Sequence, residues 1–134
     1  MDGRGVPLSI VVTGANRHDV TQLALVLDEI VISRPEDVKQ HLCADKGYSG
    51  APALKAITDR NYIPHVKQRG EELQEKKANP AYKARRWVVE VSHSWFNRFR
   101  KLLVRYEKLN ATYLALLQFA AAIIAFRKTG AIYG

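Results

Sequence analysis

The chain has few of the residues that belong to secreted or membrane proteins. Its 134 residues include one cysteine, Cys43, so no disulfide can form within it. This fits a reducing cytoplasm, and the apolar run around Cys43 predicts a small core residue. No apolar stretch near the N-terminus has the length of a signal peptide. The most apolar run, residues 113–126, is shorter than the roughly 20 residues that cross a bilayer. We therefore expect a cytoplasmic protein with no membrane partner.

Motifs of common metal and nucleotide enzymes are missing as well. One cysteine and four scattered histidines do not give the ligand spacing of a structural zinc site. Gly3 and Gly5 form too short a motif for a phosphate-binding loop. The sequence therefore excludes zinc-finger and nucleotide-loop proteins.

Acidic residues are scarce in the C-terminal part of the chain. Residues 1–81 hold eleven acids and eleven bases, whereas residues 82–134 hold ten bases and two acids, Glu90 and Glu107. The whole net charge of +8 therefore lies in the second part. Such asymmetry predicts a polyanionic partner, with nucleic acid first and an anionic membrane second. A solvated basic face is the alternative that charge alone leaves open.

Apolar periodicity predicts an α/β fold. The expected order is strand, helix, strand, helix, strand, with strands at 7–13, 41–44 and 62–66, a helix capped by Asp19 and a helix started by Pro52. This alternation favours at least partly parallel strands. Three short strands make a thin sheet, so the chain resembles the back part of a larger α/β domain.

The remainder of the chain predicts a loop and two long helices. Residues 68–81 are polar and lack an apolar period, so we expect a mobile loop. A helix over 82–108 and a last helix over 111–128, capped by Asn110, should follow. The last helix is apolar nearly all round, which predicts burial against the sheet or against another chain.

The first of these helices carries the most informative pattern. An apolar stripe runs along one side, and the opposite side presents Glu90 with His93 one turn on and Arg86 one turn back. A surface helix with an Arg86–Glu90 ion pair is the simpler interpretation. Trp87 flanks the stripe and could stack on a base, whereas Trp95 lies within the stripe and should be core.

Asp45 adds a second carboxylate. It follows the short apolar strand, and in open α/β sheets functional groups gather at the carboxyl ends of strands. Two or three such oxygens suit Mg²⁺, although a turn or cap role for Asp45 is an equally simple interpretation. Tyr48 could lie near such a site, but a packed turn aromatic is the favoured interpretation.

Four sequence blocks, taken together, resemble a known family. They are Asp2–Leu8, Thr13–Asp19, Ala44–Tyr48 and Arg86–Glu90, with Trp95–Arg100 after the last. Their content and order are similar to those of bacterial insertion-sequence transposases of the DDE type. The resemblance covers nearly the whole chain and identifies residues 1–134 as the C-terminal part of a transposase catalytic domain.

The resemblance implies a partial RNase H-like fold and a metal-dependent reaction on DNA. It places two of three metal-binding catalytic carboxylates at Asp45 and Glu90, with Mg²⁺ or Mn²⁺ as the cofactor. These enzymes cleave DNA at the ends of the element and join the ends to target DNA. The basic side chains near Glu90 would bind DNA; they are Arg86, His93, Arg98, Arg100 and Lys101.

Some positions depart from the family pattern. Asn97 stands where a Lys or Arg is expected after Glu90, with Arg98 and Lys101 following. The family's first Asp lies upstream of the turn that contains Asp2, so Asp2 is not that residue. We therefore expect the third ligand from an upstream segment, little activity from the isolated chain, and partnership with that segment or with a second copy. A frameshifted element and a truncated copy both fit.

Two other functions remain open from the sequence. A non-catalytic DNA-binding fragment that regulates or inhibits transposition would use the basic helix without the carboxylates. An unrelated basic interaction module would instead dock a partner on its apolar last helix.

Overall fold

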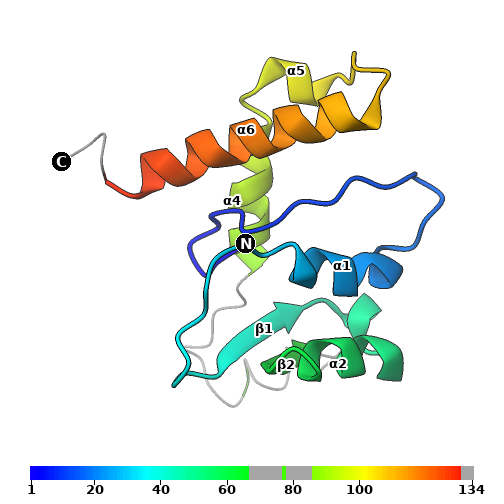
Figure 1. The fold of residues 1–134 in the computed structure, drawn as a ribbon, viewed down its shortest axis with the longest axis vertical. Coiled ribbons are helices and arrows are strands. Elements are labelled where there is room, and N and C mark those ends of the chain that lie inside the picture. The colour runs from blue at the N-terminus through cyan, green and yellow to red at the C-terminus, as the bar shows by residue number, and fades with distance from the viewer. Residues whose placement is uncertain (67–76, 78–85, 131–134) are drawn as a thin grey trace. The chain divides into compact units, whose positions relative to one another are not determined.

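The computed structural model describes residues 1–66, 77 and 86–130. Apart from residue 77, the predicted loop over 68–81 lies outside these residues. The chain divides into two compact units, one formed by Thr13–Ala84 and the other by Met1–Val12 with Arg85–Gly134. Figure 1 labels their helices and strands.

The Thr13–Ala84 unit contains the alternating elements. They are the 3-10 helix η1 (Asp19–Gln22), α1 (Leu23–Asp28), β1 (Gln40–Ala44), the 3-10 helix η2 (Lys46–Tyr48), α2 (Ala51–Thr58) and β2 (Tyr62–Val66). β1 and β2 are parallel, with Gln40 opposite Tyr62 and Ala44 opposite Val66. Parallel strands need a crossover connection, and α2, which begins with Pro52 in its first turn, lies within that connection. The α/β prediction is confirmed for this part of the chain.

One face of the two-stranded sheet is covered. Leu42, Tyr62 and Val66 pack against a core of Leu23 from α1 and Ala53 and Ile57 from α2. The alternate residues of both strands, namely His41, Cys43, Ile63 and His65, are exposed. The prediction that Cys43 is a core residue is therefore wrong, because its side chain points to the face that α1 and α2 do not cover.

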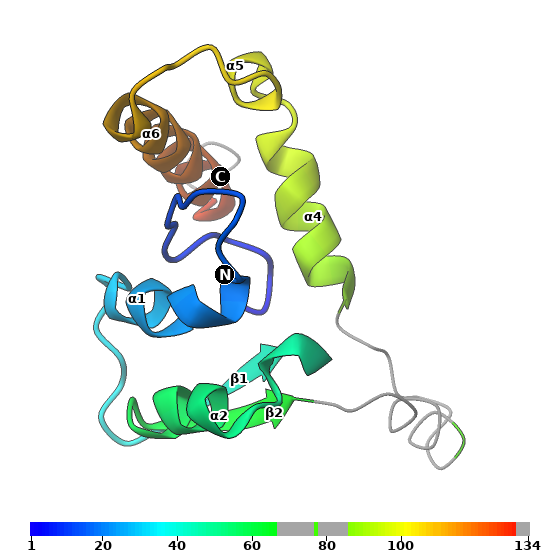
Figure 2. The same cartoon turned by 90° about the vertical axis from the view of Figure 1, so that its right-hand side faces the viewer.

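The described residues of the other unit form helices that follow one another along the chain, as Figure 2 shows. They are α4 (Arg86–Phe96), α5 (Arg100–Leu103) and α6 (Asn110–Lys128). A single helix over 82–108 is therefore wrong beyond Phe96. The amides of Arg98 and Phe99 bond to the carbonyls of Trp95 and Phe96, three residues back, at 3.2 and 3.0 Å, which tightens the last turn. Phe99 is then extended, with φ −90° and ψ 99°.

The N-terminal segment does not form the predicted strand at 7–13. In the part of the chain that the structure describes, the sheet consists of β1 and β2 alone. Asp2 instead organises a turn, since its Oδ1 accepts the amides of Arg4 and Val6 at 2.8 and 2.9 Å. The buried Ser92 of α4 donates its hydroxyl to the carbonyl of Gly5. The β-branched residues at 7–13 therefore do not enter a strand ladder, and the turn before them is held to α4 through Gly5.

Both predicted N-caps are displaced by one residue. Asp19 and Asn110 are the first residues of η1 and α6, and the preceding His18 and Leu109 have extended backbones. Neither His18 nor Leu109 makes a capping bond with its side chain. The Asn110 side chain accepts from Arg105 instead.

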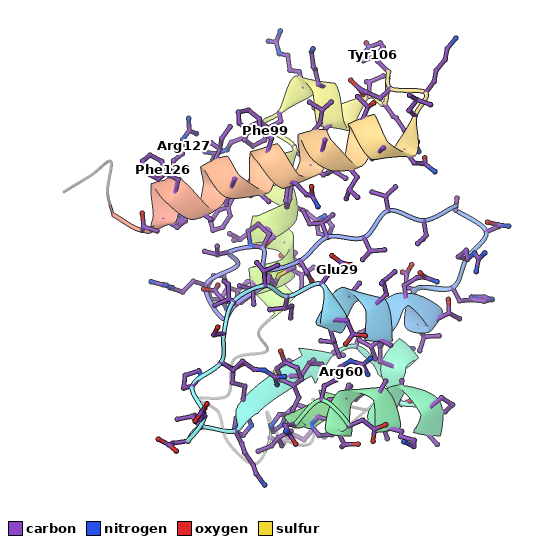
Figure 3. The ribbon with its side chains drawn as sticks, viewed as in Figure 1. Glu29, Arg60, Phe99, Tyr106, Phe126 and Arg127 are labelled. Atoms are coloured by element: carbon purple, nitrogen blue, oxygen red, sulfur yellow. The ribbon has the colours of Figure 1, made fainter. Side chains whose placement is uncertain are left out.

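The last helix is only partly covered. Ala120 and Ile124 are buried, and Lys128 lies 4.2 Å from the centre of the Trp95 ring. Phe119 and Phe126 are 67% and 58% exposed, and Figure 3 labels Phe126 near the end of the helix. Within this unit α6 is therefore only partly covered, and its burial against the sheet or against another chain stays a prediction. By length and composition alone, the 19-residue α6 could cross a membrane, a weak indication because core helices of soluble proteins pass the same test.

Gly5 has a conformation that other residues rarely adopt, with φ +89°. A Cβ at this position would lie 3.2 Å from the carbonyl oxygen of Val88 and 3.3 Å from Ser92 Oγ. We expect Gly5→Ala to lower the free energy of unfolding by about 1–3 kcal/mol. Gly3→Ala is the control, because nothing lies within 4 Å of a Cβ there. Urea denaturation measures both, and equal stability of the two variants would contradict the prediction.

An ion pair ties α1 to the segment that leads from α2 to β2. Arg60, labelled in Figure 3, donates from Nε and Nη2 to the two carboxylate oxygens of Asp28, both at 2.6 Å. Its Nη1 donates to the carbonyl of Ala56 at 3.0 Å. These hydrogen bonds from Arg60 lower the pKa of Asp28 below its usual value of 3.8.

A lowered pKa in the folded state gives stability that is present above pH 3.8 and is lost as the pH falls through the folded-state pKa. We expect Asp28→Asn to be less stable than the wild type at pH 7, and the difference to vanish at strongly acidic pH. Glu29→Gln, at the neighbouring exposed acid labelled in Figure 3, should be neutral. Urea denaturation from pH 7 down to pH 2 checks this, and a pH-independent difference would contradict it.

Candidate metal and nucleic-acid site

Asp45 stands directly after β1. Its Oδ1 accepts the amide of Gly47 at 2.8 Å and so caps η2. The turn role that the sequence left open is therefore confirmed. This bond occupies one of about four lone-pair positions of a carboxylate, and the residue is exposed. Capping and cation binding are compatible in this geometry.

Two further side chains share the surroundings of Asp45. Tyr48 is partly buried against the core of Leu23, Ala53 and Ile57, which confirms it as a packed turn aromatic. Burial raises the pKa of its hydroxyl, and the negative charges of Asp19 and Asp45 raise it further. Asp19 therefore belongs to the same charged environment as Asp45. The sequence predicted it only as a helix cap, although it lies in one of the four blocks of the resemblance.

Glu90 lies in α4, in the other unit. Glu90, His93 and Trp87 are exposed, whereas Val88 and Ser92 on the other side of the helix are buried. The two faces predicted from the apolar period are therefore correct along α4. Arg86 is the first residue of that helix.

The remaining basic residues leave the helix that was expected to carry them. Arg98 lies in the break between α4 and α5, and Arg100 and Lys101 lie in α5; all three are exposed. Because α4 ends at Phe96, the single helix expected over 82–108 does not carry these three residues. Their unit still carries most of the net positive charge. It has ten bases and three acids, whereas Thr13–Ala84 has eleven bases and ten acids.

The structure places the two carboxylates in different units. Asp45 belongs to Thr13–Ala84 and Glu90 to the unit formed by the chain ends, so their meeting at one cation stays a prediction. Among the described residues, no three His, Cys, Asp or Glu side chains are grouped so as to hold a metal ion. Each carboxylate is exposed.

Comparisons with known proteins relate these residues to one family. Residues 42–127, which include both Asp45 and Glu90, match the family described as the transposase DDE domain. The chain is 32% identical over 130 residues to a Burkholderia cepacia protein assigned as a transposase for insertion sequence element IS402. That match covers 93% of this chain and 59% of the relative, so the chain spans less than two thirds of the relative's length. No solved structure gives a significant match. On the family match, which extends over more than half of its residues, the chain belongs to the transposase DDE-domain family.

Proposed function

We propose that the chain acts in DNA transposition in the bacterial cytoplasm, as the C-terminal part of an RNase H-like catalytic domain. Asp45 and Glu90 are two of the ligands for Mg²⁺ or Mn²⁺ in this proposal. A bound ion of this kind activates a water or a 3′-hydroxyl and stabilises the leaving oxygen in phosphodiester chemistry. The observation that carries the proposal is that the family match spans both exposed carboxylates.

The donor atoms suit the expected cofactor. Both side chains offer carboxylate oxygens, the ligand type that Mg²⁺ and Mn²⁺ prefer. The Gly47 amide fixes the orientation of Asp45 while leaving other oxygen lone pairs for a cation. Two protein ligands are few for catalysis, so the proposal includes a third carboxylate from another segment of a longer transposase.

The basic residues hold the DNA in this proposal. His93, Arg98, Arg100 and Lys101 are exposed, and with Arg86 they contact phosphates. Contacts of this kind fix the position of the strand without reading its sequence. Trp87, which is 51% exposed, can stack on an unpaired base. The expected substrates are the ends of an insertion sequence and its target DNA.

A non-catalytic role is the second candidate. The described residues contain no group of three metal-ligating side chains. In this candidate the positive charge of the unit formed by the chain ends binds the DNA without a metal. Such a fragment would bind insertion-sequence ends, or join a full-length transposase, and inhibit transposition. The two candidates differ in whether the carboxylates and the divalent cation matter.

The basic residues should control DNA affinity through salt. Binding of the wild-type chain to duplex DNA should weaken linearly on a log–log plot of affinity against salt. We expect Arg98→Ala and Lys101→Ala each to lower affinity and to reduce the slope by about 1. Lys39→Ala, at an exposed base in the nearly neutral unit, is the matched control. Fluorescence anisotropy at several salt concentrations measures the slopes, and equal slopes for all variants would contradict the assignment.

The carboxylates should control metal binding and cleavage but not DNA binding. We expect Asp45→Asn and Glu90→Gln each to weaken Mn²⁺ binding by the chain, measured by water-proton relaxation. The Asn side chain can still accept the Gly47 amide, so the turn after β1 should survive. Asp59→Asn is the control, since Asp59, the residue after the end of α2, pairs with Lys55 at 2.5 Å.

Cleavage in this proposal requires a third carboxylate from another segment of a transposase. We expect Mg²⁺-dependent cleavage of insertion-sequence ends when the chain is combined with the part of the Burkholderia cepacia relative that the match does not cover. Each carboxylate variant should lower the cleavage rate by about 100-fold or more. Removing a metal ligand should lower activity at least as much as removing a residue that only supports a ligand. Unchanged cleavage in Glu90→Gln would remove Glu90 from the site. Unchanged DNA binding without any Mg²⁺-dependent cleavage would favour the regulatory candidate.

A further inference from the structure

The exposed face of the β1–β2 sheet carries a close pair of histidines. His41 Nδ1 and His65 Nε2 lie 2.5 Å apart. The two rings are stacked, with their centres 4.7 Å apart and their planes inclined by 28°. Both residues are exposed, and neither belongs to the carboxylate site described above. The pair is therefore a feature that the proposed function does not use.

The strand pairing places this pair. In the parallel register His41 is opposite Ile63, and His65 is opposite Cys43. His41 and His65 are thus diagonal neighbours on one face, and the ladder holds their backbones in place. Two nitrogens this close share one hydrogen, since a neutral imidazole has one donor and one acceptor nitrogen. The same acceptor nitrogens are the atoms by which histidine binds metals.

We propose that His41 and His65 form a two-imidazole binding site for a divalent transition-metal ion of the Zn²⁺, Ni²⁺ and Cu²⁺ class. Imidazole suits these ions, whereas Mg²⁺ prefers oxygen. At zinc–nitrogen distances of about 2.0–2.1 Å in tetrahedral geometry, the two nitrogens lie about 3.3 Å apart. The exposed rings therefore need to separate by less than about 1 Å. Solvent completes the coordination, because no third ligand group joins the pair among the described residues.

A bound ion would join β1 to β2 through side chains as well as through the backbone ladder. It would bind the folded sheet better than the unfolded chain, in which the two histidines are 24 residues apart. Binding should therefore raise the melting temperature in proportion to the logarithm of ion concentration. The site is independent of the proposed transposition chemistry, and Mg²⁺ should not substitute for Zn²⁺ in it.

The test uses the full 134-residue chain with Cys43→Ser, so that the exposed thiol cannot supply the binding. Isothermal titration with ZnCl₂ should show one ion per chain. His41→Gln and His65→Gln should each weaken the affinity about tenfold or more. His18→Gln, at an exposed histidine outside the sheet, is the matched control and should bind like the parent. MgCl₂ at the same concentration should give no heat and no rise in melting temperature.

A second measurement needs no histidine substitution. In NMR spectra of the parent chain, Zn²⁺ should shift the ring proton signals of His41 and His65 together and leave those of His18 unchanged. The proposal is overturned if zinc does not bind. It is also overturned if the affinity is the same in His41→Gln and His65→Gln as in the parent, or if the His41 and His65 signals do not respond. Each of these results would leave the transposition proposal intact, since that proposal depends on Asp45 and Glu90.

Discussion

The parallel pairing of β1 with β2 is the constraint on which the Thr13–Ala84 unit depends. Two parallel strands cannot be joined by a tight turn, so the chain must cross over the sheet between them, and α2 lies in that crossover. The crossover helix also supplies Ala53 and Ile57, which with Leu23 close one face of the sheet. Because Arg60 then holds Asp28, the end of α1 is fixed relative to the end of α2. Asp45 lies where β1 ends, and the amide of Gly47 fixes the orientation of its side chain.

Short-range sequence patterns predicted the helices and strands of this unit well. They failed where the structure depends on contacts between residues far apart in the sequence. Apolar runs at 41–44 and 62–66 and Pro52 in a first helical turn were enough to predict β1, β2 and α2. The same composition at 7–13 gave no strand, because a strand exists only where another strand accepts its hydrogen bonds. Cys43 shows the same limit. Because side chains alternate along β1, Cys43 and Leu42 lie on different faces of the sheet. The sequence does not say which of the two faces the helices cover.

The candidate site shows how far periodicity and resemblance each extend. Periodicity placed Glu90 and His93 on the exposed face of α4, because the helix is regular there. It failed at Asn97–Phe99, because the apolar spacing continues there although the helix ends. Two hydrogen bonds between residues three apart close the last turn at this point. The resemblance, in contrast, selected Asp45 and Glu90 without reference to geometry, and their roles stay a prediction, although the family match includes both residues. It did not distinguish Asp19 from its neighbours. Only the surroundings of Tyr48 show that Asp19 shares the charged environment of Asp45.

The two metal proposals both involve β1 but concern different chemistry. Asp45 offers oxygens at the end of β1, and the histidine pair offers nitrogens on the face of the same strand. A hard ion such as Mg²⁺ and a borderline ion such as Zn²⁺ are therefore separated by donor type rather than by pocket shape. The carboxylate and imidazole positions differ also in what fixes them. The Gly47 amide orients Asp45, whereas the register of β1 and β2 orients His41 and His65. A substitution that weakens the pairing of β1 with β2 would therefore disturb the histidine pair first, because the pair needs both strands. The side chain of Asp45 is oriented by the turn after β1 alone.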